Sequence, residues 1–324
     1  MNTHSHERDH PGVLVRDSVA PDSIVVEAAD GYRIKGFAWR HPEARPADSP
    51  VVIVNAATSV RCRYYSRFAA FLFGEGFDVL TYDYRGIGES RPVTLRGFDA
   101  GWIDWGSLDF DAMLRYAERT YSGQPIQVVA HSVGGLLIGL SNSNHLIRRV
   151  FTVGAQYAYW PDYAAKARLQ MLAKWHIAMP AFTLLSGYFP GKKLGWLEDT
   201  PKGIVRDWVL SRKRFEDTWR GSAAARYPQK QDLVKRFTNL TAPTLAVHIT
   251  DDDFGTEPAV RRLLSYFTNS PRTMVKISPE SIAEPAIGHF GFFNSRYEQK
   301  LWRMPSDWLR FGKMPERWSA DVPA

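Results

Sequence analysis

One serine in this sequence lies in a setting that suits a catalytic nucleophile. Ser132 follows an apolar run over residues 126–130 and precedes a second apolar run, rich in glycine, over residues 134–140. A nucleophilic serine on a sharp turn between a strand and a helix needs small residues two positions before and two positions after it. Ala130 and Gly134 meet that need. The helix N-terminus favours negative charge at the turn, so the pattern predicts Ser132 as a nucleophile.

A serine hydroxyl is a weak nucleophile and needs a base to take its proton. Four histidines follow the serine in the chain: His145, His176, His248 and His289. His289 comes after the last predicted strand, between Gly288 and Gly291, which allow tight backbone turns. A loop in that place can bring an imidazole back over the serine. We therefore predict His289 as the base, with His145 at the surface, His176 in an inserted segment and His248 as a structural residue within a strand.

The third member of such a site is an acid that fixes the imidazole tautomer and stabilises the imidazolium. Three consecutive aspartates follow the predicted strand over residues 244–249: Asp251, Asp252 and Asp253. We choose Asp252, and Asp251 and Asp253 stay open as alternatives. The two that are not the acid would belong to a solvated turn or would cap a helix that begins near Pro258.

Acyl transfer also needs backbone amides that bind an oxyanion. The N–H of Val133, directly after the nucleophile, is one predicted donor, and the other comes from the loop after the third predicted strand. That loop, residues 55–58, consists of small residues that allow close backbone approach, and we choose Ala57 as the donor. Residues 83–90 are also rich in glycine but lack the full spacing of a phosphate-binding loop. We predict a structural turn there, near the rim of the site.

The segments that must position these residues alternate between strand and helix. Predicted strands are short and rich in valine, isoleucine or aromatic residues, over residues 24–27, 32–39, 51–55, 78–82, 126–130, 150–153, 244–249 and 273–277. Predicted helices cover residues 64–74, 99–121, 134–140, 258–267 and 296–311. This alternation predicts an α/β fold with a mostly parallel, doubly wound sheet.

One segment interrupts the alternation. About 90 residues separate Val153 from Thr244, far more than an ordinary connection between elements. They include five of the eleven tryptophans: Trp160, Trp175, Trp196, Trp208 and Trp219. We predict a helical cap over residues 155–240, inserted into a core of residues 21–154 and 241–312, after a flexible tail of residues 1–20. The alternative is that the insertion merely extends the core.

Charge is concentrated in the predicted cap. The chain has 41 Lys and Arg against 34 Asp and Glu, a net charge of +7, while residues 155–240 alone hold 15 basic and 7 acidic residues. This excess is either a solvated basic face or a surface that attracts anionic substrates or makes weak contact with anionic lipid. No recognised nucleic-acid-binding module occurs, so we expect no nucleic-acid partner.

Several features bear on location and cofactors. The single cysteine, Cys62, cannot form an internal disulfide. Residues 1–20 lack the apolar centre of a signal peptide, and Lys174, His176 and Pro180 interrupt the longest apolar stretch, so we expect no membrane span and a cytoplasmic protein. The histidines near the N-terminus lack a folded frame, so we expect no metal site and no cofactor.

The same residues carry a family resemblance. The sequence resembles the α/β-hydrolase superfamily, and more narrowly a bacterial group of predicted serine α/β-hydrolases. The segments that carry it are residues 83–92, 95–98, 104–106, 131–135, 187–191 and 287–293. The resemblance implies an eight-stranded, mostly parallel sheet, a lid, and a triad of Ser132, Asp252 and His289. Two departures are Ala130, where the group usually has glycine, and the residues after Asp253, where it has a proline-rich pattern.

We therefore expect a serine hydrolase that cleaves a carboxylic ester, or a thioester, through an acyl-enzyme. The aromatic cap favours a small-molecule substrate with an apolar acyl or aromatic group. An amidase or an acyltransferase would use the same triad. The alternative from another class is a non-catalytic ligand-binding protein that kept the fold.

Overall fold

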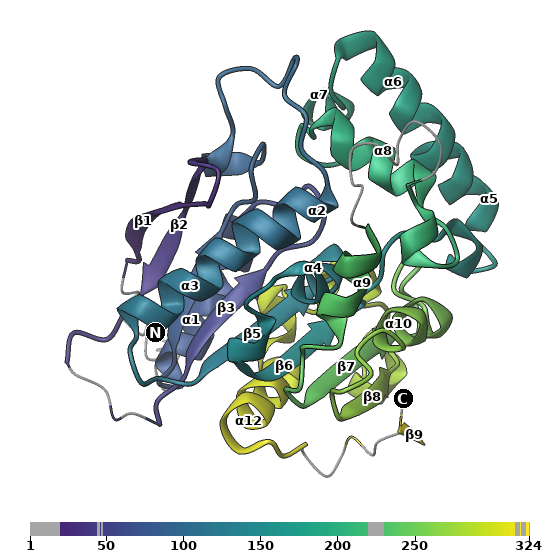
Figure 1. Ribbon diagram of the computed structural model, residues 1–324. Helices are drawn as coiled ribbons and strands as arrows, with labels where there is room; N and C mark the ends of the chain where they lie inside the picture. Colours follow the sequence, from purple (N-terminus) through teal and green to yellow (C-terminus); the bar gives the residue numbers. More distant parts are fainter. Residues whose placement is uncertain are drawn as a thin grey trace, which may run out of the picture.

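The computed structural model describes residues 20–43, 46, 48–219, 230–314, 318 and 322–323. Apart from Ala20, the predicted N-terminal tail lies outside these residues. The centre of the molecule is a sheet (Figure 1), whose strands are β1 (Asp22–Glu27), β2 (Arg33–Trp39), β3 (Val51–Asn55), β4 (Asp78–Tyr82), β5 (Ile126–His131), β6 (Ile147–Val153), β7 (Thr244–Ile249), β8 (Arg272–Ile277) and β9 (Val322–Pro323). Their order across the sheet is β1-β2-β4-β3-β5-β6-β7-β8-β9.

The sheet is mostly parallel, as the alternation of elements predicts. Strands β4, β3, β5, β6, β7 and β8 pair in parallel, while β1 and β2 pair antiparallel at one edge and β9 pairs antiparallel with β8 at the other. The eight predicted strands are all present, and the two-residue β9 is an addition. Every residue of β3, β4, β5 and β7 is buried, because helices cover both faces of a parallel sheet.

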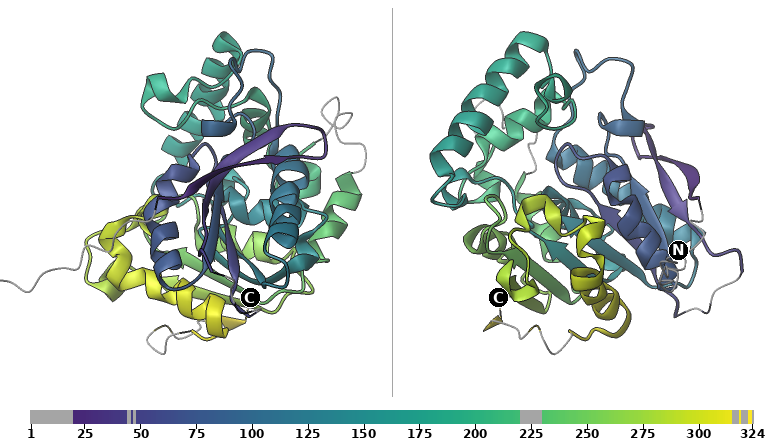
Figure 2. Two further views of the ribbon diagram at one scale, coloured as in Figure 1. Left: turned by 90° about the vertical axis from the view of Figure 1, so that its left-hand side faces the viewer. Right: turned by 180° about the vertical axis from the view of Figure 1, so that it is seen from behind.

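Two layers of helices enclose the sheet (Figures 1 and 2). One layer contains α1 (Ser66–Gly74) and α12 (Arg303–Phe311); the other contains α3 (Asp111–Thr120), α4 (Val133–Leu140), α9 (Lys230–Phe237) and α10 (Glu257–Leu264). In α12 the side chains of Met304, Trp308 and Leu309 are buried, the spacing of one apolar helix face. Helix α4 is buried on all sides because it packs between the sheet and α9.

Between β6 and β7 the chain leaves the core and forms a helical cap (Figure 1). A continuous helical segment consists of α5 (Arg168–Met171), the π-helical turn η6 (Leu172–Ala178) and α6 (Met179–Ser186), and α7 (Gly191–Leu194) and α8 (Lys202–Leu210) follow it. Helix α9 falls within the predicted cap range, but it packs on α4 in the core: a Cβ added at Gly139 would lie 2.1 Å from Phe237.

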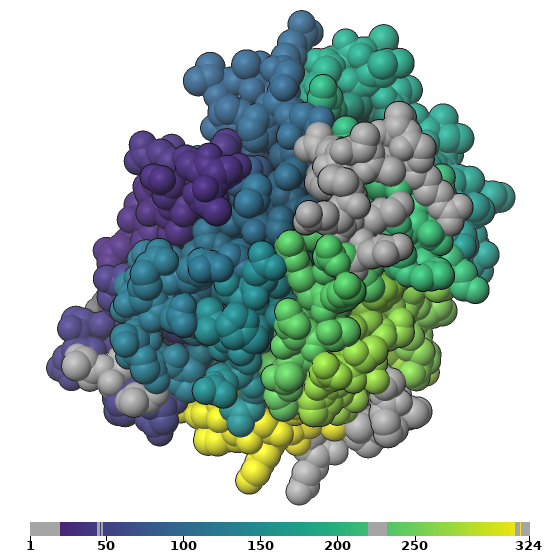
Figure 3. All heavy atoms as spheres, viewed as in Figure 1, coloured from purple at the N-terminus to yellow at the C-terminus, as the bar shows by residue number. Residues whose placement is uncertain are grey.

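Buried polar contacts attach the cap to the core. The Asp207 carboxylate of α8, fully buried, accepts hydrogen bonds from the Trp102 amide (2.8 Å) and the Trp219 indole (2.9 Å). At the upper surface the blue segment that follows β4 lies against the teal cap (Figure 3), where Arg91 Nη1 is 2.8 Å from Asp199 Oδ2. Within the described residues, no helix has the length and apolar character needed to cross a bilayer.

Candidate active site

The predicted site residues converge because they follow parallel strands. Ser132 follows β5, Ala57 comes shortly after β3, Asp252 follows β7 and His289 lies beyond β8, in α11 (Gly288–Gly291). The carboxyl ends of neighbouring parallel strands meet at one edge of the sheet, and side chains placed there can share a crevice. The cap lies over the same edge of the sheet (Figure 1).

Ser132 occupies a strained turn between β5 and α4. Its φ of 55° and ψ of −123° lie in a region that residues with a side chain rarely adopt. The Ser132 amide donates to the Val153 carbonyl (3.0 Å), which holds the turn against β6. A Cβ at Gly134 would lie 2.6 Å from the Asn55 carbonyl oxygen, so the close approach of α4 to the loop after β3 requires glycine at this position.

A short hydrogen bond joins Asp252 to His289. Oδ2 of Asp252 is 2.7 Å from Nδ1 of His289, and Oδ1 accepts from the amides of Phe254 (2.7 Å) and Gly255 (2.8 Å). Burial alone would raise the pKa of Asp252, but attraction to His289 and these hydrogen bonds bring the pKa below its ordinary value. A carboxylate at this place keeps the proton on Nδ1 and leaves Nε2 of His289 as an acceptor.

The other two aspartates have different partners. Asp251 accepts hydrogen bonds from the amides of Ile287 (2.8 Å) and Gly288 (3.0 Å), and thereby holds the loop that carries His289. Asp253 lines the pocket with its side chain 41% exposed, 3.9 Å from Nζ of Lys166. Neither aspartate caps the next helix, since the Thr256 hydroxyl accepts from the Ala259 amide there.

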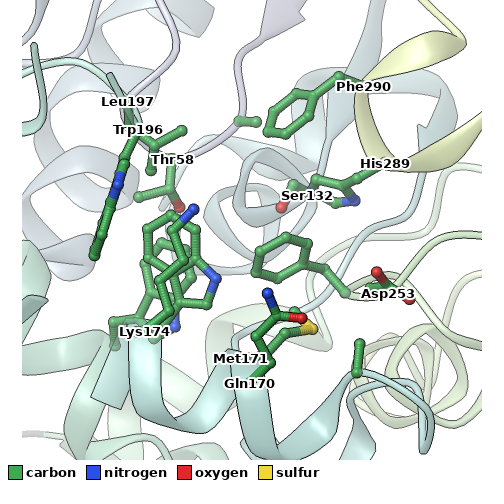
Figure 4. Close-up of a pocket in the computed structure, with 15 residues that line it drawn as sticks. Thr58, Ser132, Gln170, Met171, Lys174, Trp196, Leu197, Asp253, His289 and Phe290 are labelled. Atoms are coloured by element: carbon green, nitrogen blue, oxygen red, sulfur yellow. The ribbon is translucent and has the colours of Figure 1, made fainter. Parts of the chain in front are cut away.

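Ser132 and His289 both line one pocket of about 290 Å³ between the core and the cap. Figure 4 shows the two side chains next to each other in its wall. Most of the remaining lining is apolar and comes from the cap, with Met171, Trp175, Trp196 and Trp208 as main contributors, while Phe254 and Phe290 add aromatic rings from the core. The rings of Trp175 and Trp208 stack with centroids 5.2 Å apart. Such walls suit an apolar or aromatic group.

The two predicted oxyanion donors differ in their availability. The Val133 amide lies in the first turn of α4, where amides have no acceptor within the helix. Ala57 lines the pocket, but its amide donates to the Tyr65 hydroxyl (2.9 Å). A buried side chain that the sequence pattern does not reveal therefore already accepts the Ala57 N–H, and Ala57 as an oxyanion donor stays a prediction.

Tyr65 belongs to a buried chain of hydrogen bonds, here called the relay, that ends at the backbone carbonyl of His289. The Tyr65 hydroxyl is 2.7 Å from Nδ1 of His131, and Nε2 of His131 is 2.9 Å from the His289 carbonyl oxygen. Burial lowers the pKa of His131 to about 3, with the nearby His289 adding to the effect, so His131 is neutral. Nε2–H then donates to the carbonyl and Nδ1 accepts from Tyr65. His131 lies inside the serine motif, yet the motif alone gives it no role.

Gln156 is a second residue that sequence reasoning did not identify. Its Nε2 donates to Oγ of Ser132 (3.3 Å), its Oε1 accepts from the Ala158 amide, and only 5% of the residue is exposed. The contact fixes the position of the serine hydroxyl. The only signal for it in the sequence is a polar residue shortly after β6.

The remaining candidates lie in structural settings. His248 is buried in β7, His145 is exposed, and His176 of the cap lies 3.2 Å from the Tyr163 hydroxyl. In the turn after β4, the buried Asp83 accepts from two backbone amides, those of Cys62 (2.6 Å) and Glu89 (2.8 Å), as expected of a structural turn. Across the described ranges, no group of three or more His, Cys, Asp or Glu side chains could hold a metal ion.

Known proteins resemble this chain at the level of family and fold. Residues 46–280 match the family model described as "Serine aminopeptidase, S33". No curated protein matches the sequence. A soluble variant of monoglyceride lipase from Saccharomyces cerevisiae has a similar structure, with a TM-score of 0.59 and 14% identity over 93% of this chain and 97% of that one.

Two esterases are also similar in structure. One is from Pyrococcus furiosus, with a TM-score of 0.55 and 14% identity over 95% of this chain and 97% of that one. The other is a cold-adapted esterase from an Arctic intertidal metagenomic library, with a TM-score of 0.52 and 14% identity over 93% and 96%. At this level of identity the likeness is one of fold.

Proposed function

Because the chain belongs to the serine aminopeptidase S33 family of α/β-hydrolases, we propose that it hydrolyses carboxylic esters through an acyl-enzyme on Ser132. One observation carries the proposal: a serine on a strained turn and a histidine bonded to a buried carboxylate line the same pocket. The esterases and the lipase among the similar structures support an ester as substrate. A ligand-binding protein would have no need of this arrangement.

Acylation begins when Oγ of Ser132 attacks the ester carbonyl carbon while Nε2 of His289 takes the hydroxyl proton. The new Oγ–C bond gives a tetrahedral oxyanion. When the oxyanion collapses, the bond to the alcohol oxygen breaks and His289 returns the proton to the leaving alcohol. Water then repeats the sequence on the acyl-enzyme, with His289 as base, and releases the carboxylic acid. Asp252 stabilises the imidazolium in both halves.

The oxyanion receives two backbone N–H groups in this account. The Val133 amide supplies the first. The Ala57 amide supplies the second after it leaves the Tyr65 hydroxyl, because a charged oxygen accepts a stronger hydrogen bond than a neutral hydroxyl. The exchange costs little, since the Tyr65 oxygen loses one donor but keeps its bond to His131.

A substrate panel tests the reaction type. We would measure turnover of 4-nitrophenyl esters, acyl thioesters and amino-acid anilides by wild type and Ser132→Ala, with an alcohol added in one arm to detect acyl transfer. We expect the esters to react best and the variant to lose at least about 10³-fold in kcat. Equal turnover by both proteins would exclude Ser132 as the nucleophile, and a preference for anilides would make the protein a peptidase.

We also propose that the cap makes weak contact with anionic lipid surfaces. The outer face of the α5–η6–α6 segment exposes Leu169 (79%), Ile177 (64%), Leu184 (86%) and Leu185 (80%) to solvent. Their spacing of seven or eight residues places them along one helical stripe. An exposed apolar helical stripe is typical of helices that lie in a membrane interface, and the excess of basic residues over 155–240 favours an anionic surface.

Vesicle co-sedimentation tests this contact. We expect binding to phosphatidylglycerol vesicles that exceeds binding to phosphatidylcholine vesicles, that weakens as salt is added, and that is lost in the double variant Leu184→Asp, Leu185→Asp. The proposal would be contradicted if the wild type does not bind, or if its binding is the same for both vesicle types and at every salt concentration.

A further inference from the structure

We propose that Lys174 determines specificity by binding a carboxylate on the substrate, so that the preferred esters carry an anionic group on the part that fills the aromatic end of the pocket. This inference rests on the proposed ester hydrolysis and names its substrate class. Lys174 lies in η6 and its side chain extends from the helix into the pocket (Figure 4).

Two indole rings hold the Lys174 ammonium in place. Nζ lies 4.5 Å from the ring centroid of Trp196 and 4.6 Å from that of Trp175. The faces of these rings attract a cation and confine it on one side of the pocket. The two rings meet edge to face, with centroids 5.7 Å apart, so the anchor itself is packed in the cap. A charge fixed in this way offers a defined point of attachment to a ligand.

Neighbouring lysines differ from Lys174 in having acidic partners. Lys192 lies 3.1 Å from Glu198, and Lys166 lies 3.9 Å from Asp253. In the part of the chain that the structure describes, no carboxylate forms an ion pair with Lys174. Partial burial lowers the pKa of Lys174, because the pocket deprives its ammonium of water. A cation that has lost water without gaining an acid is stabilised when a ligand brings a negative charge.

The charges in the pocket also orient such a ligand. Asp253 and Lys174 lie on opposite sides of the pocket, with the Ser132 hydroxyl between and above them in the view of Figure 4. A substrate carboxylate is therefore repelled from the Asp253 side and attracted to the Lys174 side. The tryptophans around Lys174 accept the apolar spacer that separates this carboxylate from the ester.

Two classes of ester meet these requirements: monoesters of dicarboxylic acids with an apolar chain, and esters of hydroxybenzoates. The first class places the carboxylate on the acyl group and the second on the alcohol. Both combine apolar surface with one negative charge, and each has a neutral counterpart of nearly the same shape in which the free carboxylate is a methyl ester.

Matched pairs test the inference. We would measure kcat/KM for 4-nitrophenyl monoesters of adipate, pimelate and suberate and for acetyl esters of hydroxybenzoates, each against its methyl-capped counterpart. Wild type should prefer the anionic member of at least one class about tenfold. Lys174→Met should abolish that preference, and Lys174→Arg should retain most of it.

Lys193→Met is the matched control, because it removes the same charge from an exposed lysine of the cap that does not line the pocket. This variant should keep the wild-type preference. A wild type that favours the neutral member of every pair, or a Lys174→Met variant that keeps the anionic preference, would overturn the inference. Equal losses in both lysine variants would indicate net charge rather than a binding residue, and would also overturn it.

A binding measurement separates this inference from the proposed reaction. In Ser132→Ala protein, the Kd values of 4-phenylbutyrate and 4-phenylbutanamide would be measured from the change in tryptophan fluorescence. The Kd of 4-phenylbutyrate should be about tenfold lower. In the double variant Ser132→Ala, Lys174→Met the two Kd values should be equal. If no ester is hydrolysed but this difference is present, the proposed reaction fails and the anion site stands. If esters are hydrolysed and the two ligands bind equally, the anion site alone fails.

Discussion

Asp252 and His289 meet through a hydrogen bond of 2.7 Å between Oδ2 and Nδ1, although 37 positions separate them in the chain. The bond keeps the proton of His289 on Nδ1 and leaves Nε2 unprotonated, as a base requires. Because Asp252 makes this bond and its two neighbours have other partners, replacing each of the three adjacent aspartates should have a different effect on the reaction.

Asp252→Asn should reduce kcat by about 10⁴ while leaving the fold intact, because an amide can hold the imidazole in the wrong tautomer. Asp253→Asn should change kcat for a neutral ester little, since Asp253 does not contact His289. Asp251→Asn should have an intermediate effect through the loop that it holds. Steady-state kinetics of the three variants on one 4-nitrophenyl ester would check this order, and a larger loss in Asp253→Asn would contradict it.

Gln156→Leu should lower kcat about tenfold with little change in KM, because the serine hydroxyl loses the donor that positions it. Gln156→Glu is the matched comparison: it keeps the size of the side chain but replaces the donor with a charge next to the nucleophile, and should lower kcat further. Parallel kcat and KM measurements distinguish this positioning role from a general loss of folding, which circular dichroism would reveal. An unchanged kcat in Gln156→Leu would show that the contact has no part in the reaction.

The fold and the serine turn could be predicted because their signals are local. Apolar runs of strand length, glycine at position 134 and helical periodicity each depend on a few neighbouring residues. The choice among Asp251, Asp252 and Asp253 could not be settled that way, since the direction of each side chain depends on the turn after β7. The hydrogen bond from Ala57 to Tyr65 is equally invisible, because a pattern of small residues does not show which side chain folds back on the loop.

The boundary of the cap and the last strand also could not be predicted from local sequence patterns. The length of the insertion predicts an extra structure, but only packing shows that α9 lies on α4 in the core. The short β9 pairs with β8 through two residues near the C-terminus, too few to give a strand pattern. The relay from Tyr65 to His131 joins residues 66 positions apart and has no periodic signature.

The unfolding free energy should fall as pH drops from about 6.5 toward 3. Burial lowers the pKa of His131 to about 3 and that of His176 to about 4, below the ordinary value of 6.5. In this window the unfolded chain binds protons that the folded chain excludes. The contribution of the two neutral histidines to the unfolding free energy is therefore fully present above pH 6.5 and is lost as the pH falls toward their folded-state pKa values. Each histidine contributes a slope of up to roughly 1.4 kcal/mol per pH unit.

Urea unfolding of wild type and His131→Gln between pH 7 and pH 4 would check this dependence. The variant should be less stable at pH 7, since the relay is interrupted, but its stability should fall less steeply with acid. His176→Gln should flatten the curve in the same direction. Parallel curves for wild type and both variants would contradict the assignment of these two histidines as buried neutral groups.

Arg85→Met should destabilise the protein by about 3–5 kcal/mol, because it leaves a fully buried carboxylate without its cation. Arg85 Nε lies 2.6 Å from Asp109 Oδ1, and burial already raises the pKa of Asp109 to about 7 in spite of that contact. Arg261→Met, which breaks an exposed helical pair with Glu257, should cost less than about 1 kcal/mol. Thermal and urea unfolding of both variants would measure the contrast, and equal losses would refute it.

The most direct test of the account is the position of a covalent adduct. The protein would be treated with a fluorophosphonate, digested and sequenced by tandem mass spectrometry, alongside Ser132→Ala and His289→Asn. We predict a single adduct on Ser132 in wild type, none in Ser132→Ala, and labelling at least about 10³-fold slower in His289→Asn. Labelling at another residue, or an equal rate of labelling with and without the His289 imidazole, would contradict the claim that Ser132 is a nucleophile activated by His289.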